Sequence, residues 1–449
     1  MGQSSSTEQG ASPELREVQS LVASTGALPS LQKSFPLLSD PQTQSIPLPS
    51  LRVWLLLRRQ LPLARILGAQ RRIHVLRLID ETEESLFRTG KFGRFGGIFV
   101  PETLVTCLRM LLSEFNLCMH DPHFQRSSQN QQRPRSGHAR QAHGLAKCGG
   151  RATGAGQHGV ATAAACAKLA LKCSIIMGHL DMERQSSNVL LMKHLGAEVK
   201  SVQGTLKDAT SEAIRKWVGD LERKYYLAGT AVGPHPCPAM VREFQSIIGK
   251  ETRRQSIQKW GGKPDVLVAC VGTDSNALGM FHEFVRDEEV RLIGVEAAGT
   301  SIDGETHSAT LAKGEIGVYH VAMTLLLQDH EGQIVGPHSV GVGLEYPGVS
   351  PELSFLREIG RAEFHTATDE EALDVYALLC RLEDICPALE AAHALAHLGK
   401  LCPTLPDGAK VVVNCSGHGD KDIETVFKYQ QLKSGKVSDG NNHPKPLQM

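Results

Sequence analysis

The chain lacks the features that place many sequences in a broad class at first sight. Its 48 basic residues are balanced by 48 acidic ones, so no excess charge favours nucleic acid or an acidic partner. Its apolar runs are only a few residues long, which excludes a membrane-spanning helix. We therefore expect no nucleic-acid or membrane partner. What remains is a globular protein of 449 residues, long enough for two or three domains and a large core.

The chain also lacks the cysteine patterns of a metal site or a disulfide framework. Its eleven cysteines are scattered, with no CxxC pair and no Cys/His spacing typical of zinc ligands. We interpret them as reduced thiols of a reducing compartment, and we predict no metal site.

Acidic residues are scarce near the N-terminus. None lies between Asp40 and Asp80, although that stretch carries several arginines, and residues 1–50 are rich in Ser, Pro and Gln. A Ser-rich, Arg-rich and acid-poor segment is typical of an organelle transit peptide. We therefore predict that residues 1–85 are a transit peptide or disordered, and that the protein is located in a plastid. The alternative is a disordered basic tail on a cytoplasmic protein.

From about residue 150 onward, apolar strands alternate with helical patterns. Continuous apolar strands of this kind are typical of parallel sheets covered by helices on both faces, so we predict an α/β protein. Strands are expected at 173–177, 225–229, 264–272, 290–296 and 409–417, and helices at 183–196, 367–384 and 387–401.

Three glycine-bearing loops, at 153–159, 272–276 and 415–422, stand where such a sheet binds ligands. Ligands of parallel sheets bind beyond the carboxyl ends of the strands. The first loop runs into the start of a helix, where unpaired backbone N–H groups favour an anion. Each loop alone is equally compatible with a tight turn. Together they predict one site assembled from several strand ends.

Longer motifs carry a resemblance to a known family. In chain order they are GRFGGIFVPETLV (93–105), TGAGQHGVATA (153–163), MERQSSNVLLMKHLGAEV (182–199), GTLKDATSEAIRKWV (204–218), VGPHPCPAMVREFQSIIG (232–249), RLIGVEAAG (291–299), YPGVSPE (346–352) and SGHGDKD (416–422). These motifs resemble the tryptophan synthase β chain, a pyridoxal-phosphate enzyme of the type II fold. The resemblance runs from about Lys91 to Glu424, with one gap.

The resemblance implies the fold and its division. The type II fold has two domains, each with a mostly parallel twisted sheet flanked by helices. The expected parts are 86–125 and 231–425 in the main cofactor domain, 151–230 in the smaller domain, 126–150 as an irregular segment that replaces part of the family's core, and 426–449 as a flexible tail.

The resemblance also implies an activity. Members of the family condense L-serine with indole to give L-tryptophan and water. Pyridoxal phosphate is held as a Schiff base on a lysine, and indole arrives through a tunnel from a partner α chain. The implied partners are therefore L-serine, indole and a tryptophan synthase α chain, together with a second copy in a homodimer. A monovalent cation near the cofactor is a further implication.

Substrate-binding residues follow from the same resemblance. The loop at the first motif would bind the substrate carboxylate with its N–H groups, through Thr153, Gly154, Ala155, Gly156, Gln157 and His158. Glu345 stands where the family has an aspartate at the gate of the site.

Cofactor-binding residues are implied in the same way. Gly272, Ser275 and Asn276 match a loop that cradles the cofactor phosphate, and Glu390 matches a glutamate that faces the cofactor. Ser416 matches a hydroxyl set against the pyridine nitrogen, which makes the ring a milder electron sink. Taken alone, Ser416 would be a turn serine and Glu390 a solvated helix residue.

The phosphate loop departs from the family at two glycine positions, which here are Thr273 and Asp274. A Cβ at a left-handed position costs about 1–2 kcal/mol. A carboxylate about 4 Å from a phosphate charge repels it by about 4 kcal/mol at an effective dielectric near 20. The repulsion shrinks if Asp274 turns away and caps the following helix. In either case we predict weakened cofactor binding. Together with the missing lysine described next, the prediction is that pyridoxal phosphate binds weakly or without a covalent bond.

The Schiff-base lysine of the family is not found. Its segment, Ala-His-Lys-Ile-Asn-Asn, has no counterpart in residues 126–150, which lack periodicity and aliphatic content. Arg140 lies nearest, but a guanidinium is not an amine nucleophile. Lys147 better matches a later, non-catalytic lysine. In addition, Ala152 replaces a glutamate, and loss of a general acid–base group costs about 10²–10⁴ in rate.

Three interpretations stay open. The chain is an active tryptophan synthase β chain with the missing segment compensated, a catalytically dead homologue that binds an α-type partner or its own copy, or a product of wrong splicing. Another type II enzyme, such as a serine dehydratase or cysteine synthase, explains 232–245 and 416–422 less well. We favour a tryptophan synthase β-like protein that is severely impaired.

We expect the chain to form no stoichiometric lysine adduct when it is incubated with pyridoxal phosphate and reduced with borohydride. The reason is that the family's lysine has no counterpart, and a Schiff-base lysine must be positioned as well as present. Peptide mapping by mass spectrometry checks this. A stoichiometric adduct on any lysine, Lys147 included, would show that a covalent cofactor site survives.

Overall fold

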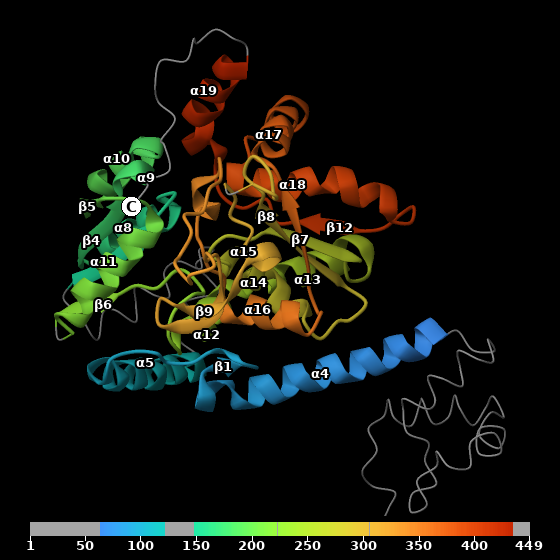
Figure 1. Cartoon of the computed structure of the whole chain (residues 1–449), viewed down its shortest axis with the longest axis horizontal. Helices are drawn as coiled ribbons and strands as arrows, with labels where there is room; N and C mark the ends of the chain where they lie inside the picture. Colours follow the sequence, from blue (N-terminus) through green and yellow to red (C-terminus); the bar gives the residue numbers. More distant parts are fainter. Residues whose placement is uncertain (1–62, 122–147, 222, 305, 434–449) are drawn as a thin grey trace, which may run out of the picture. The chain divides into compact units, whose positions relative to one another are not determined.

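The computed structural model describes residues 63–121, 148–221, 223–304 and 306–433 (Figure 1). The chain divides into two compact units, residues 1–81 and 82–449. Helix α4 (Leu63–Thr89) begins in the first unit and ends in the second. Part of this helix lies within residues 1–85, which the sequence predicted to be a transit peptide or disordered. All strands of the described residues belong to the second unit.

One parallel sheet of the second unit has the strand order β5-β4-β3-β6. Its strands are β3 (Cys148–Thr153), β4 (Lys172–Gly178), β5 (Glu198–Val202) and β6 (Lys224–Tyr226). The associated helices are α8 (Gln157–Lys168), α9 (His179–Arg184), α10 (Ser186–His194) and α11 (Leu206–Val218). Leu206, Ala209 and Ala213 of α11 pack on Ala152 of β3 and Ile176 of β4. The first residues of β3 lie within 126–150, where we expected irregular structure.

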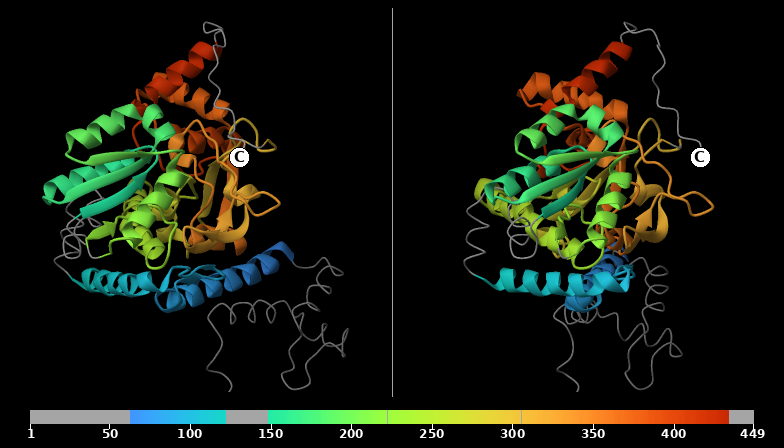
Figure 2. Two further views of the ribbon diagram at one scale, coloured as in Figure 1. Left: turned by 60° about the vertical axis from the view of Figure 1, so that its left-hand side comes forward. Right: turned by 90° about the vertical axis from the view of Figure 1, so that its left-hand side faces the viewer.

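A second parallel sheet has the order β11-β8-β7-β12. Figure 2 shows the ribbon of Figure 1 from two further sides. Its strands are β7 (Val266–Cys270), β8 (Arg291–Ala297), β11 (Glu363–Ala367) and β12 (Val411–Val413). Every residue of β7 is buried, and α18 (Leu389–Leu401) packs its alanines on β7 and β8. Around this sheet lie α12 (Cys237–Gln245), α13 (Ile247–Trp260), α14 (Ser275–Phe281), α17 (Asp369–Glu383) and α19 (Ile423–Lys433). The predicted α/β fold with parallel sheets flanked by helices is confirmed.

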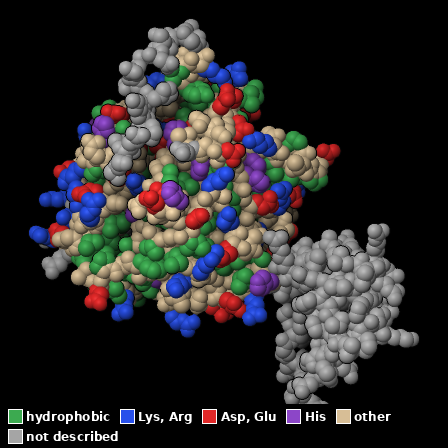
Figure 3. Space-filling model, in the orientation of Figure 1, with side chains coloured by type: hydrophobic (Ala, Val, Ile, Leu, Met, Phe, Trp, Pro, Cys, Tyr) green, Lys and Arg blue, Asp and Glu red, His purple; other side chains and the backbone are tan. Residues whose placement is uncertain are grey.

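A third sheet is antiparallel and was not predicted from the sequence. Its order is β1-β2-β10-β9, from β1 (Lys91–Phe92), β2 (Phe95–Gly96), β9 (Glu315–Tyr319) and β10 (Ala322–Leu326). Strand β9 is at the edge, and its Ile316 and Val318 side chains are exposed. Figure 3 shows where apolar side chains gather on the face of the molecule seen in Figure 1. The remaining elements are α5 (Glu102–His120), α15 (Thr310–Lys313), α16 (Pro351–Glu358) and the 3-10 turns η1 (His282–Phe284), η2 (Val342–Leu344), η3 (Cys402–Thr404) and η4 (Gly419–Asp422).

Most predicted elements are found with shifted ends. The helix expected at 183–196 is two helices, α9 and α10, separated at Gln185. The buried Gln185 side chain donates to the Asp422 carboxylate across 3.1 Å, which fixes this break. Helix α17 begins after Thr368, whose hydroxyl accepts from the Glu371 N–H as an N-cap. Within the described residues, no helix is both long enough and apolar enough to span a bilayer.

A buried ion pair joins α4, α12 and α16. The Arg242 guanidinium lies 2.7 Å from the Glu83 carboxylate and 3.4 Å from that of Glu352, with its side chain only 4% exposed. His282 lies 3.8 Å from Glu352, so this cluster has the ligand types of a cation site. Arg242 already supplies its positive charge, and we interpret the cluster as structural.

We expect Arg242→Met to lower the free energy of unfolding by about 3–5 kcal/mol, because it leaves the buried Glu352 carboxylate and the half-buried Glu83 carboxylate without their partner. Arg215→Met is the matched control. Arg215 also pairs with a glutamate, but its side chain is 70% exposed, so its loss should cost no more than about 0.5 kcal/mol. Urea denaturation of both variants measures the difference. Equal losses would show that the buried pair is not a stabilising element.

Candidate active site

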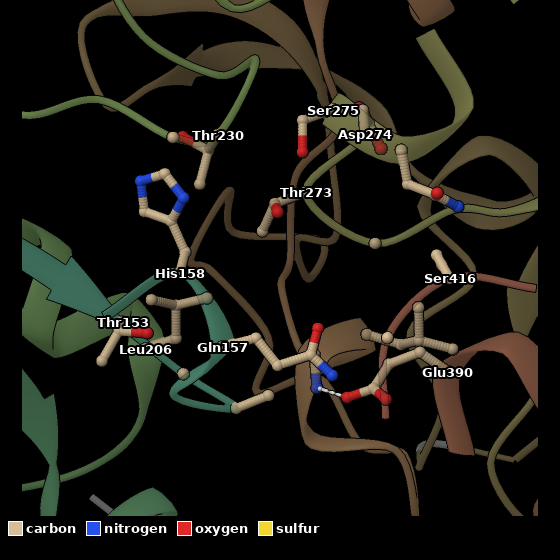
Figure 4. Close-up of a pocket in the computed structure, with 18 of the residues that line it drawn as sticks. Thr153, Gln157, His158, Leu206, Thr230, Thr273, Asp274, Ser275, Glu390 and Ser416 are labelled. Carbon is tan, nitrogen blue, oxygen red and sulfur yellow. Dashed lines mark hydrogen bonds between the residues drawn. The ribbon is translucent and has the colours of Figure 1, made fainter. Parts of the chain in front are cut away.

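A cavity of about 330 Å³ lies where the carboxyl ends of β3, β7 and β12 meet (Figure 4). Its lining includes nearly every residue that the sequence predicted: Thr153, Gly154, Ala155, Gly156, Gln157, His158, Gly272, Ser275, Asn276, Glu390 and Ser416. The three strands come from the two different parallel sheets. The expected site built from several strand ends is therefore one continuous cavity, as parallel sheets favour.

The loop after β3 turns sharply into α8. Gly156 has a left-handed backbone with φ of 85°, and a Cβ there would lie 2.6 Å from the Cβ of Asn188. The Asn188 amide donates to the Ala155 carbonyl across 2.6 Å, which holds the turn from behind. The Thr153 hydroxyl accepts from the Gly159 N–H at 3.3 Å. This geometry gives an anion-binding start to a helix of 12 residues.

The loop after β7 forms the opposite wall. Figure 4 shows Thr273 and Ser275 on this side of the cavity, facing Gln157 and Glu390. Gly272 is closely packed, since a Cβ there would lie 2.6 Å from the Gly343 carbonyl oxygen. The Asn276 side chain is committed elsewhere: its amide donates to the Cys270 carbonyl at 3.2 Å and its oxygen accepts from Asn414 at 2.6 Å. Ser275 is thus the better side-chain donor of the loop.

Asp274 has a left-handed backbone, with φ of 71°, at a position where the resemblance implies glycine. Its carboxylate turns away from the loop and accepts from the Ser350 N–H, and it does not cap α14. Burial raises the pKa of the Asp274 carboxyl to about 8, although its bond to Ser350 partly offsets this. At neutral pH the group is therefore mostly uncharged, and the repulsion that we expected from it is largely removed.

Glu390 belongs to a buried charge network. One carboxylate oxygen accepts from the Gly343 N–H at 2.8 Å, and the other lies 2.9 Å from the Lys421 ammonium. Lys421 also lies 2.8 Å from Asp422, with its own side chain 3% exposed. Burial raises the pKa of Glu390, but Lys421 outweighs burial and holds it below its ordinary value. Glu390 is therefore an ionised wall residue, not the solvated helix residue that its pattern alone would indicate.

Ser416 follows β12 and faces Cys270 at the end of β7, where the two side chains are within hydrogen-bonding reach. Burial raises the pKa of the Cys270 thiol to about 12, so this thiol stays protonated. Gly417 continues the wall with φ of 85°, and a Cβ there would lie 3.0 Å from that of Ala388. The hydroxyl of Ser416 is the neutral polar group that this end of the cavity offers.

Glu345 is the one predicted site residue that does not line the cavity. Its carboxylate lies 2.8 Å from the Arg184 guanidinium of α9 and accepts from the Ser339 N–H at 3.1 Å. Arg184 also donates to the carbonyl oxygens of Ser339 and Val340. The pair therefore fastens α9, beside the β3 sheet, to the segment 339–345.

Several cavity residues were missed from the sequence, because they come from other elements without a loop signal: Leu206, Gly229, Thr230, Gln245, Ile248, Cys270, Gly343 and Leu344. Ala152 also lines the cavity and is buried, so a methyl group stands where the resemblance implies a carboxylate. Among the described residues that line the cavity, none is a lysine. Arg140 and Lys147 lie outside the described residues.

The hydrogen-bond donors of the cavity lining fit pyridoxal phosphate. Two hydroxyl-bearing residues, Thr273 and Ser275, stand on the wall formed by the loop after β7, and Ser416 stands on another wall. The loop at 153–158 offers N–H groups to a second anion. The volume is at the small end for a ligand cavity, which is typically about 300–1,000 Å³.

One comparison with known proteins bears on this cavity. A family model described as pyridoxal-phosphate dependent enzyme matches residues 150–417 of the chain. The match covers more than half of the 449 residues and includes all the loops that form the cavity.

We expect Asp274→Asn to change how stability depends on pH. In the native chain the folded carboxyl holds its proton up to about pH 8, whereas an unfolded aspartate loses it near its ordinary value of 3.8. Stability should therefore fall as pH rises from about 4 to 8, by up to about 1.4 kcal/mol per pH unit. The Asn variant lacks this contribution, so its profile should be flatter.

Urea denaturation at pH 5, 6.5 and 8 measures both profiles. Asp303→Asn is the matched control, because that carboxylate is 86% exposed. The control should follow the native chain. Parallel profiles for the native chain and the Asp274 variant would mean that this carboxyl is ionised in the folded state.

Proposed function

The chain belongs to the family of pyridoxal-phosphate-dependent enzymes, and on this premise we propose that it is a tryptophan synthase β-like protein with impaired catalysis. The reaction of that family type joins L-serine to indole, giving L-tryptophan and water. In this proposal the cavity binds pyridoxal phosphate weakly and without a covalent bond, and its second anion site takes the carboxylate of L-serine.

One observation carries the proposal. The loop 153–158, the loop 272–276, Glu390 and Ser416 come from distant parts of the chain, yet all line one cavity. By the resemblance, the loop 153–158 would bind the substrate carboxylate and the loop 272–276 the cofactor phosphate. Glu390 would face the cofactor, and Ser416 would face its ring nitrogen. None of the described lining residues is a lysine, and Lys147 lies outside the described residues.

The chain's own residues would act chiefly in binding and orientation. When bound, pyridoxal phosphate supplies an electron sink for the amino-acid substrate. The Ser275 hydroxyl would donate to the phosphate, and Ser416 would donate to the ring nitrogen without fully protonating it. The N–H groups of Gly154 to His158 would hold the substrate carboxylate. Glu390, braced by Lys421, would keep its negative charge at the cavity wall.

In this proposal the site lacks a side chain for proton transfer at position 152. A carboxylate at position 152 could help the serine hydroxyl to leave as water and then manage the proton of indole. Ala152 can neither donate nor accept a proton, and it packs in the apolar cluster with Ile176 and Leu206. Loss of such a group costs about 10²–10⁴ in rate. This loss adds to that of the lysine amine, which would also serve as a base.

A second candidate is a non-catalytic protein that binds an α-type partner or a second copy of itself. The edge strand β9 favours it, because Ile316 and Val318 expose apolar side chains there. Location in a plastid stays part of the proposal and rests on the composition of the N-terminal segment. The splicing alternative is tested separately, by sequencing the transcript across codons 125 to 151.

We expect Ser275→Ala to weaken pyridoxal-phosphate binding by about 1.5–3 kcal/mol, roughly 10- to 100-fold, because it removes a hydrogen bond to a charged group. Fluorescence titration measures the affinity. Ser301→Ala, which changes an exposed serine away from the cavity, is the control and should bind like the native chain. Equal affinities for all three would remove the phosphate assignment from this loop.

The same preparation tests the reaction. Serine-dependent consumption of indole should run at least about 10²-fold more slowly than in an active β chain assayed beside it. A rate close to the reference, with contaminating enzyme excluded, would overturn the impaired assignment. Cofactor binding together with turnover that is reduced at least about 10²-fold is the outcome that the proposal requires.

A further inference from the structure

Two thiols outside the cavity lie almost close enough to bond. Cys380 is in the last turns of α17 and Cys386 is in the loop before α18, and their sulfur atoms are 3.3 Å apart. Asp384 has a left-handed backbone with φ of 57° at the end of α17, which turns the chain back so that the loop passes the helix. A disulfide requires a sulfur–sulfur distance of about 2.0 Å, so closure needs a shift of little more than about 1 Å.

Solvent can reach this pair. Cys386 is exposed, and Cys380 is half-buried against the cluster that includes Tyr376 and Leu389. A second pair, Cys166 and Cys173, offers a contrast, because both of its thiols are buried although they are within hydrogen-bonding reach of each other. Proximity is thus shared by both pairs, whereas access to an oxidant in solution distinguishes the Cys380–Cys386 pair.

We propose that Cys380 and Cys386 form a reversible disulfide when the chain meets a small-molecule disulfide such as oxidised glutathione. The Cys386 thiolate attacks one sulfur of the small disulfide and releases one equivalent of glutathione thiolate. The Cys380 thiolate then attacks the Cys386 sulfur of the mixed disulfide and releases the second equivalent. The two protein thiols lose two protons and two electrons, and the oxidant becomes two glutathione thiols.

The surroundings of the two cysteines decide which thiol attacks the oxidant first. Burial, followed by the neighbouring Cys386 thiol, raises the pKa of Cys380 to about 11. The exposed Cys386 is therefore the thiol that meets the oxidant, and Cys380 is the resolving thiol. Resolution is intramolecular and needs only the small approach of two sulfurs already in contact.

The bond would reach the cavity wall through the backbone. The Cys386 carbonyl accepts from the Gly419 N–H at 3.1 Å, and the Tyr376 hydroxyl of α17 donates to the Gly419 carbonyl at 3.3 Å. Glu390 lies four residues beyond Cys386, at the start of α18. Closing the bond ties the end of α17 to the segment that packs against the wall at Ser416–Gly419. This inference does not depend on the proposed function.

The sequence makes the test direct, because trypsin cleaves after Arg381, between the two cysteines. Residues 362–381 carry Cys380 alone and residues 382–400 carry Cys386 alone. The folded, full-length chain is treated with excess oxidised glutathione, alkylated, digested and mapped by mass spectrometry. We expect the two peptides to appear linked, at their summed mass less two hydrogen atoms. Dithiothreitol should restore both alkylatable thiols.

Two variants sharpen the result. Cys386→Ser should abolish the linked peptide, whereas Cys402→Ser, which removes another exposed thiol, should leave it unchanged. Separate alkylation of both thiols after oxidation, a lasting glutathione adduct on Cys386, or a link from Cys386 to Cys402 or Cys415 would overturn the proposal. A Cys166–Cys173 link formed equally well would also count against it, since that pair is buried.

Discussion

A single buried ammonium group, that of Lys421, holds together the segments around the cavity. It lies 2.9 Å from Glu390 at the start of α18 and 2.8 Å from Asp422 in the turn after β12. Glu390 in turn accepts from the Gly343 backbone, and Asp422 accepts from the Gln185 side chain between α9 and α10. Breaking such a buried pair by removing one partner typically costs about 3–5 kcal/mol. The segments that carry Glu390, Gly343 and Gln185 are therefore linked through the charge of Lys421.

The sequence was most informative where structure depends on local pattern. The apolar strand 264–272 and the glycine-bearing loops after it and after 409–413 predicted both the parallel sheet and where its ligand cavity opens. The antiparallel sheet was not predicted, because β2 has only two residues and pairs with β10 more than two hundred positions away. The hydrogen-bond partners of Glu345 and Asp274 were not predicted either. The direction of a side chain is set by tertiary packing and not by the spacing of residues along the sequence.

Anion binding and proton transfer depend on different parts of this site, namely the backbone and the side chains. The anion-binding loops depend on backbone geometry, which Gly156 and Asn188 preserve. Proton transfer depends on side chains, and at Ala152 the side chain offers only a methyl group. Interactions made equally with bound substrate and with the transition state do not raise the turnover rate. A change of side chain at the cavity wall therefore leaves the backbone geometry of these loops in place.

Strand β9 has a consequence for the chain in concentrated solution. Within the described residues it is the last strand of its sheet, so one side of its backbone meets no neighbouring strand. Its apolar residues Ile316 and Val318 are also exposed on this short strand. Such an edge is a template for pairing with another chain, which natural proteins usually blunt with charge, proline or a covering segment. Where it is left uncovered, such an edge offers a route to self-association through shared sheet hydrogen bonds.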